Sequence, residues 1–190
     1  MRLPLIACGL VAFLALLPGP ASAGLVTNGG VETGDFTGWT LSGPLAAEAG
    51  NYGVAAYAAH DGSYGAWFRP VSGLIYISQT LTTTPGGSYI LDGWLANVVV
   101  TGEVNQFEVW WNGALLDSLT NSDNSPYAHG SYPVTATSSS TEIKLGFMNS
   151  TVYFMFDTVD VNPAVPEPAG LFLCGGGLVL LMALLRRRRS

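Results

Sequence analysis

The chain has 190 residues, of which 11% are charged. Between Gly24 and Val165 the fixed positive charges are Arg69 and Lys144 alone, and twelve acids give this stretch a net charge of −10. This excess of negative charge argues against nucleic acid and anionic lipid as partners, and it favours cations or neutral polar polymers.

The first 23 residues have the pattern of a secretory signal peptide. Arg2 supplies the positive start, residues 10–17 form a short apolar segment, and Ala21 and Ala23 mark a cleavage site before Gly24. The alternative is an uncleaved amino-terminal anchor, but the short apolar segment and the small-residue site favour cleavage. We therefore expect the protein to be exported.

Between the two ends, short alternating runs of apolar and polar residues are separated by turn residues. The predicted strands span residues 64–68, 75–81, 89–96, 105–111, 114–119, 142–148 and 152–161. Asn112-Gly113 predicts a two-residue hairpin, and Pro85-Gly86-Gly87 predicts another turn. This pattern predicts an all-β fold for residues 24–164, an antiparallel jelly-roll-like β-sandwich.

The sandwich has no cysteine, because Cys8 and Cys174 lie in the two ends of the chain. It therefore has no disulfide and no thiol nucleophile. A domain of roughly 140 residues buries enough surface to fold without a disulfide.

Residues 28–39, with the sequence NGGVETGDFTGW, resemble the opening of some carbohydrate-binding modules that have a galactose-binding-like sandwich. Residues 60–64, 77–81 and 156–161 continue this resemblance along the domain. Val31 stands where an aromatic residue is commoner and Thr158 where a second acid is common, which puts metal binding in doubt but leaves the fold intact.

The resemblance implies that Glu32 and Asp157 meet at one structural calcium ion. The alternation of residues independently predicts that Asp157 shares a strand face with Val159 and Val161, which have the character of core residues. A carboxylate on an apolar face needs a partner, and a hard cation with oxygen ligands is one solution. The alternative is an acid that is capped or hydrogen-bonded at a strand end.

Carbohydrate contact is the second kind of site that the sequence suggests, because sugar rings stack on exposed aromatic side chains. In residues 105–111, alternation places Gln106, Glu108 and Trp110 on the face opposite Phe107, Val109 and Trp111. Trp110 is therefore a candidate sugar platform, and Trp94 is a second one. Packing in the core or at its rim is the alternative, which we expect for Trp39, Trp67 and Trp111.

No catalytic motif is evident in the sequence. His60 and His129 are its two histidines, and it has no Gly-x-Ser-x-Gly, His-Glu-x-x-His or phosphate-binding loop. The spacing of the acids does not nominate a glycosidase pair. We therefore expect a protein that is not an enzyme.

The C-terminal segment begins with Pro166-Glu167-Pro168, a stiff element because two prolines fix the backbone. Residues 169–185 are uncharged and mostly apolar, which predicts one transmembrane helix. Four arginines follow: Arg186, Arg187, Arg188 and Arg189. They predict that the C-terminus stays in the cytoplasm while the domain faces outward. These properties alone also fit an ordinary stop-transfer anchor.

Residues 165–190 resemble the PEP-CTERM sorting signal, in which a Pro-Glu-Pro motif, an apolar helix and an arginine cluster occur in this order. The resemblance implies an exported protein of an exopolysaccharide-producing bacterium, whose tail is recognised and cleaved by an exosortase. Its partners would be the export machinery, the exosortase and, transiently, the inner membrane, with a final location at the cell surface or outside the cell. Ectodomains with such tails often open like residues 28–39.

Together these features predict a non-enzymatic surface or matrix protein that associates with exopolysaccharide. Two alternatives stay open. One is a structural matrix protein without glycan binding, and the other is a hydrolase that acts on polysaccharide.

Overall fold

The computed structural model describes residues 24–100 and 102–164. The predicted cleavage residues Ala21 and Ala23 lie outside the described residues, as does the whole predicted tail with Pro166, Glu167, Pro168, Arg186, Arg187, Arg188 and Arg189. Across the two described ranges, no helix has the length and apolar character needed to cross a membrane.

Ten strands and one short 3-10 helix make up the described domain. They are β1 (Thr40–Ser42), β2 (Tyr52–Ala55), η1 (Ala56–Ala58), β3 (Gly65–Phe68), β4 (Ile75–Thr82), β5 (Ser88–Val98), β6 (Asn105–Trp111), β7 (Ala114–Thr120), β8 (Ser125–Thr135), β9 (Ser140–Asn149) and β10 (Tyr153–Pro163).

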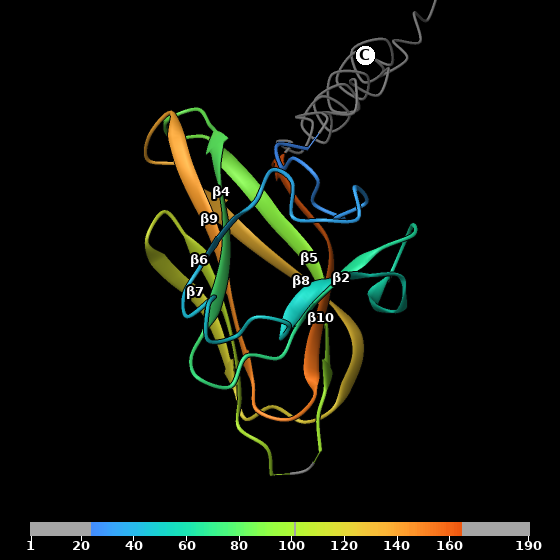
Figure 1. Ribbon diagram of the computed structural model, residues 1–190. Coiled ribbons are helices and arrows are strands. Elements are labelled where there is room, and N and C mark those ends of the chain that lie inside the picture. The colour runs from blue at the N-terminus through green and yellow to red at the C-terminus, as the bar shows by residue number, and fades with distance from the viewer. Residues whose placement is uncertain (1–23, 101, 165–190) are drawn as a thin grey trace, which may run out of the picture.

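The strands form two antiparallel sheets that pack face to face (Figure 1). The first sheet has the order β1-β4-β9-β6-β7, and the second has the order β2-β3-β10-β5-β8. Among the described strands, β2–β3 and β6–β7 are hairpins within one sheet, and every other connection crosses between the sheets. The predicted all-β antiparallel sandwich is confirmed, with the crossing connections typical of jelly-roll folds.

The core lies between the sheets because alternate residues of each strand point inward. At its centre, Phe68 of β3 stacks on Phe147 of β9 with ring centroids 4.2 Å apart. Both side chains are fully buried, and each contributes about 1.5–3 kcal/mol by leaving water. Trp39 and Trp111 are 7% and 5% exposed, which confirms the prediction that they pack in the core or at its rim.

Both predicted turns are present. Asn112 and Gly113 have φ angles of 48° and 81°, the left-handed pair that a tight β-hairpin of this type needs, and they join β6 to β7. At the second turn Gly86 has a φ of 77°, and the N–H of Gly87 donates to the carbonyl of Thr84 at 2.8 Å.

β1, β2 and β8 are missing from the predicted set of strands. In β8 the alternation is interrupted by Pro126 and Pro133, which have no N–H to give to a sheet. β8 lies at the edge of the second sheet and pairs with β5 alone. An edge strand tolerates proline because one side of its backbone has no partner strand.

The predicted position of Asp157 on the face of Val159 and Val161 is wrong. The pairing of β10 with β5 shifts register between Asp157 and Asp160, and Thr158 within the shift has a φ of 52°. The irregularity reverses the alternation, so that Asp157 lies on the outer face of the second sheet, in register with Trp94. Asp157 is still only 1% exposed, because residues 60–64 cover it.

A buried acid fastens the loop before β2 to the loop after β3. The Glu48 carboxylate accepts hydrogen bonds from the N–H of Val71 at 3.0 Å, from Nδ2 of Asn51 at 2.7 Å and from Ser72. Burial raises the pKa of Glu48, but the hydrogen bonds from Ser72, Asn51 and Val71 outweigh it and lower the pKa to about 2. Glu48 therefore stays ionised at neutral pH and holds both loops.

Candidate functional site

The outer face of the first sheet carries a connected group of aromatic and polar side chains around Trp110. The indole Nε1 of Trp110 donates to Oε2 of Glu108 at 2.8 Å, and the hydroxyl of Tyr76 donates to the same oxygen at 3.1 Å. Nε2 of Gln106 donates to the other oxygen at 2.7 Å. Lys144 completes the group from β9, and we call these five residues the Trp110 platform.

A glycine gives the platform its flat shape. Gly146 of β9 stands between Tyr76 of β4 and Glu108 of β6 in the strand register. A Cβ atom at Gly146 would lie 2.5 Å from the Tyr76 ring, so this ring crosses β9 where no side chain interferes. Burial and the neighbouring Glu108 raise the pKa of the Tyr76 hydroxyl, which therefore stays protonated and able to donate.

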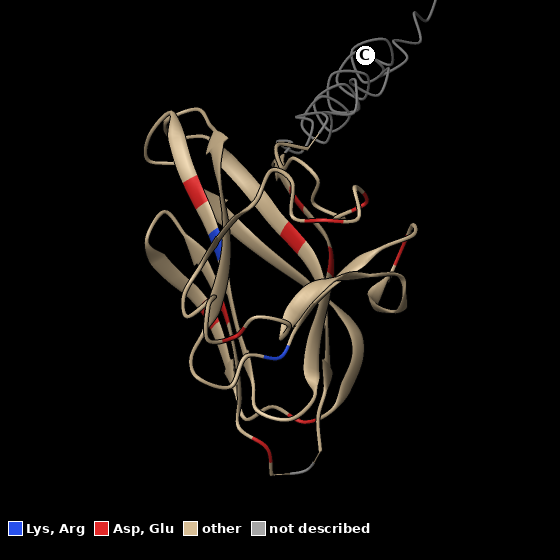
Figure 2. Ribbon diagram, in the orientation of Figure 1, with Lys and Arg blue, Asp and Glu red and all other residues tan. Residues whose placement is uncertain are grey.

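Lys144 places a positive charge between the two aromatic rings of the platform. Its Nζ lies 4.7 Å from the centroid of Trp110 and 5.0 Å from that of Tyr76, within the range of cation–π attraction. No described carboxylate lies within 4 Å of this ammonium. Arg69 and Lys144 are the only lysine or arginine residues in the described ranges. Figure 2 shows how rare blue is beside red on this domain.

The structure confirms the predicted placement of Trp110 on the outer face, while its role as a sugar platform stays a prediction. Trp110 is half-buried on the outer face beside Glu108 and Gln106, as the alternation of residues 105–111 predicts. Tyr76 and Lys144 are the members that sequence reasoning missed. They come from other strands, and alternation within one strand carries no information about the neighbour's register.

Trp94, the second predicted platform, lies on the outer face of the second sheet under other side chains. The ring of His60 stacks on its indole with centroids 4.0 Å apart, and His129 packs against it at 5.1 Å. His129 also lies beside Asp92, with Nε2 and Oδ1 3.4 Å apart. The structure thus brings both histidines to Trp94. Because they cover part of the indole, less of this ring is open to a sugar.

The predicted metal residues Glu32 and Asp157 are brought together by one loop, residues 60–64. Oδ2 of Asp157 accepts the N–H groups of His60 and Asp61 at 2.7 and 3.0 Å, and its Oδ1 accepts that of Thr158. Both oxygens of Glu32 accept the N–H of Ser63, at 3.0 and 2.9 Å. The N–H groups of the loop therefore donate hydrogen bonds to both carboxylates.

The two carboxylates alone are too few ligands for calcium. Calcium takes six to eight oxygen ligands, and here every oxygen of Glu32 and Asp157 already faces an N–H donor. Within residues 24–100 and 102–164 no three acidic, histidine or cysteine side chains gather as metal ligands. An ion would need backbone carbonyls and a rearranged loop.

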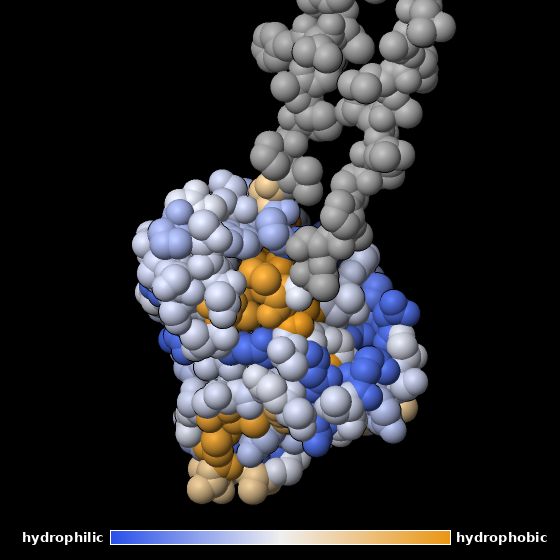
Figure 3. Space-filling model, turned by 90° about the horizontal axis from the view of Figure 1, so that it is seen from above, coloured by the Kyte–Doolittle hydropathy of each residue, from blue (hydrophilic) through white to orange (hydrophobic). Residues whose placement is uncertain are grey.

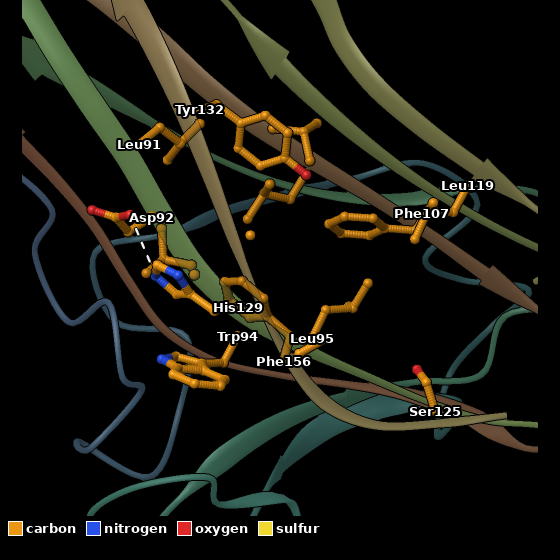
Figure 4. Close-up of a pocket in the computed structure, with 16 residues that line it drawn as sticks. Leu91, Asp92, Trp94, Leu95, Phe107, Leu119, Ser125, His129, Tyr132 and Phe156 are labelled. Atoms are coloured by element: carbon orange, nitrogen blue, oxygen red, sulfur yellow. Dashed lines mark ion pairs between the residues drawn. The ribbon is translucent and has the colours of Figure 1, made fainter.

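A separate cavity of about 190 Å³ opens between the sheets at the edge formed by β7 and β8 (Figure 4). Gly93 of β5 and Gly130 of β8, which pair in the register, are among the residues that line it. Leu95, Phe107 and Leu119 line it. A mostly apolar wall offers few partners for hydroxyl groups, and the cavity therefore suits a sugar poorly.

The rim of this cavity joins the two sheets. The hydroxyl of Tyr132 on β8 donates to Oδ2 of Asp117 on β7 at 2.9 Å, and burial and this bond raise the pKa of Tyr132. Nearby on β7, Leu115 and Leu119 are 49% and 37% exposed. Seen from above, hydrophobic patches interrupt an otherwise hydrophilic surface (Figure 3).

Comparison with known proteins finds solved structures with a similar fold but no match in sequence. No family model matches the chain, and no curated protein matches it. A family 61 carbohydrate-binding module in complex with β-1,4-galactotriose is 18% identical, with a TM-score of 0.54, over 75% of this chain and all of that one. A family 16 carbohydrate-binding module is 20% identical, with a TM-score of 0.54, over 72% of this chain and 98% of that one.

A third similar structure comes from an enzyme. The enzymatically active domain of tailspike protein 4 of bacteriophage CBA120 is 14% identical, with a TM-score of 0.51, over 74% of this chain and 21% of that one. At these identities the likeness establishes a shared fold, the β-sandwich of carbohydrate-binding modules.

Proposed function

We propose that the described domain is a non-enzymatic module that binds neutral polysaccharide through the Trp110 platform. The observation that carries the proposal is the joining of Trp110, Tyr76, Glu108 and Lys144 on one sheet face of a fold shared with carbohydrate-binding modules. The net charge of −10 between Gly24 and Val165 favours a neutral chain over a polyanion.

The platform has the parts that sugar recognition requires. The rings of Trp110 and Tyr76 offer apolar surface to the faces of pyranose rings. Glu108 is only 8% exposed and is held by three donors of the platform, so it orients Gln106 and Trp110. The amide oxygen of Gln106 can accept and Lys144 can donate hydrogen bonds, so hydroxyl groups find both kinds of partner. A sugar on the indole face displaces the Lys144 ammonium, which moves easily on its flexible stem and can then donate to that sugar.

Affinity electrophoresis tests this proposal. The full chain, purified in a detergent without a sugar headgroup, is run through gels that contain galactan, xylan or mannan. We expect at least one polysaccharide to retard it. No retardation in any gel, together with attachment to cell surfaces, would favour a structural matrix protein. Release of reducing sugar would instead identify the hydrolase.

We propose further that the protein is exported and sorted. The support comes from the sequence: the signal at residues 1–23, and Pro166-Glu167-Pro168, the apolar segment and the arginines at residues 165–190. An exosortase would cleave the tail and leave the domain at the cell surface or in the surrounding matrix, among exopolysaccharide.

Mass spectrometry of the protein recovered from cells tests the sorting step. We expect the mature form to lack residues 1–23 and to end before Arg186. Mature molecules that mostly retain Arg186–Arg189 would contradict tail processing and would leave the ordinary anchor.

Calcium binding by Glu32 and Asp157 remains a proposal that rests on the resemblance of residues 28–39 to carbohydrate-binding modules. In its favour, both side chains lie against Gly30: a Cβ there would be 3.5 Å from Oδ1 of Asp157 and 3.6 Å from Cγ of Glu32. Against it stand the N–H donors that already occupy their oxygens.

A further inference from the structure

We infer that the domain has a second polysaccharide-contacting surface on the opposite face of the sandwich, formed by Tyr57, Trp67, Arg69 and Tyr153. This inference rests on the proposed function and extends it from one contact to two. We call these four residues the Trp67 surface. It was not predicted from the sequence, where Trp67 is expected to pack in the core or at its rim.

Trp67 lies outside the core for a clear reason. Its neighbours Ala66 and Phe68 are fully buried, so the alternation of β3 turns Trp67 to the outer face of the second sheet. Gly53 of β2 is its partner in the register, and a Cβ there would lie 3.1 Å from the indole Nε1. The indole therefore crosses β2 over a residue without a side chain, as Tyr76 crosses β9 over Gly146.

Two tyrosines extend the ring surface. Tyr57 of η1 lies 6.4 Å from Trp67 and 6.0 Å from Tyr153 of β10 between ring centroids. Tyr57 is 59% exposed, more than any other large apolar or aromatic side chain of the described domain. An exposed tyrosine supported by two half-buried rings is a surface that a sugar face can stack on.

Arg69 gives this surface the same charge that Lys144 gives the Trp110 platform. Its guanidinium donates to Oδ1 of Asn51 at 3.1 Å. Arg69 follows Trp67 by two positions along the chain, and partial burial and Tyr153 raise the pKa of the Tyr57 hydroxyl, which the charge of Arg69 lowers. Lys144 lies over the half-buried rings of Trp110 and Tyr76, and Arg69 acts on the exposed Tyr57. Both fixed cations of a stretch with twelve acids can therefore donate to hydroxyl groups near the two surfaces.

The two surfaces cannot share one ligand strand, because they lie on the outer faces of different sheets with the core between them. A single domain can therefore hold two polysaccharide strands and cross-link them. Two weak contacts also raise the avidity for a polymer well above that of either contact alone. The ligand class at both surfaces is the neutral polysaccharide of the proposed function.

Stoichiometry and cross-linking test the inference together. The full chain is titrated by calorimetry with a short oligosaccharide of whichever polysaccharide retards it, and is mixed with the intact polymer to measure viscosity. We expect about two oligosaccharides per chain and a rise in viscosity. Trp67→Ala and the milder Tyr57→Ala are each expected to leave about one oligosaccharide bound and to abolish the viscosity rise.

Trp110→Ala removes the platform on the other face, so it should also leave about one oligosaccharide bound and abolish the viscosity rise. The control Tyr64→Ala changes an exposed aromatic residue outside both surfaces, so it should change neither the number of bound oligosaccharides nor the viscosity rise. The inference is overturned if the wild type binds one oligosaccharide, or if Trp110→Ala alone removes all binding. In either case the proposed function stands as long as Trp110→Ala removes the one remaining binding event. If the wild type binds no polysaccharide, the proposed function fails and this inference fails with it.

Discussion

Replacing Asp157 with alanine is expected to lower the free energy of unfolding by about 3 kcal/mol, the largest stability effect we predict for a residue of the candidate sites. Asp157 is buried and accepts three backbone N–H groups, from His60, Asp61 and Thr158. Buried donors that lose a charged acceptor cost about 1–3 kcal/mol each, less what water restores. Urea unfolding followed by fluorescence measures the change.

Asp157→Asn is the matched variant, because it keeps one acceptor oxygen, and we expect an intermediate loss. Asp123→Ala, at an exposed acid, should stay within about 0.5 kcal/mol of the wild type. A loss for Asp157→Ala as small as that of Asp123→Ala would show that the loop does not depend on this carboxylate.

The same experiment bears on calcium. An ion held by Glu32 and Asp157 raises the unfolding midpoint of the wild type relative to a chelator, because a ligand of the folded state stabilises it, and Asp157→Ala removes that rise. Equal midpoints with calcium and with chelator would mean that backbone N–H groups of the loop and of Thr158 are the sole partners of the two acids, and calcium binding would be rejected.

Trp110→Ala is expected to weaken polysaccharide binding at the Trp110 platform by about 30-fold, which corresponds to about 2 kcal/mol. The change removes the ring on which a sugar stacks and also the Nε1 donor to Glu108. Glu108 keeps Tyr76 and Gln106 as donors, so the platform loses its stacking surface more than its fold. Calorimetry with the short oligosaccharide separates this site from the second one.

Trp110→Phe distinguishes stacking from hydrogen bonding, since it keeps an aromatic face and loses only the indole N–H. We expect it to retain most of the affinity. If Trp110→Ala and Trp110→Phe weaken binding equally, the hydrogen bond to Glu108 and not the ring face is what the ligand needs. If neither changes binding, the platform is not the site.

The sequence predicts the sandwich well where a strand has neighbours on both sides. Residues 105–111 are the clearest example, because β6 has these bounds, is paired on both edges and alternates without interruption. The missing strands lie at sheet edges: β1 has three residues, β2 has four, and β8 carries two prolines. β7 is also an edge strand, but Asn112-Gly113 reveals it by marking its hairpin with β6. The three missing edge strands have no such turn signal in the predicted set.

The candidate sites follow the same logic. Trp110 is placed correctly because the register shift beside it inserts the extra residue into β7, so that β6 keeps its own alternation. Asp157 is misplaced because the shift in the pairing of β10 with β5 interrupts the alternation of β10 itself. Trp67 is a harder case. The four residues of β3 are all glycine, alanine or aromatic, so its sequence does not reveal which face meets the core, and the burial of Ala66 and Phe68 in the structure decides it.

The place of β10 in the second sheet has a mechanical consequence. β10 is the last described strand, and it lies in the middle of its sheet, with β3 on one side and β5 on the other. The N-terminal end is tied to it as well, through the hydrogen bond from the N–H of Leu25 to the carbonyl of Val161. Any tension on the chain beyond Ala164 is therefore borne by two ladders of hydrogen bonds at once. A domain tethered through its C-terminus and pulled by a moving polymer would resist force where its sheet is strongest.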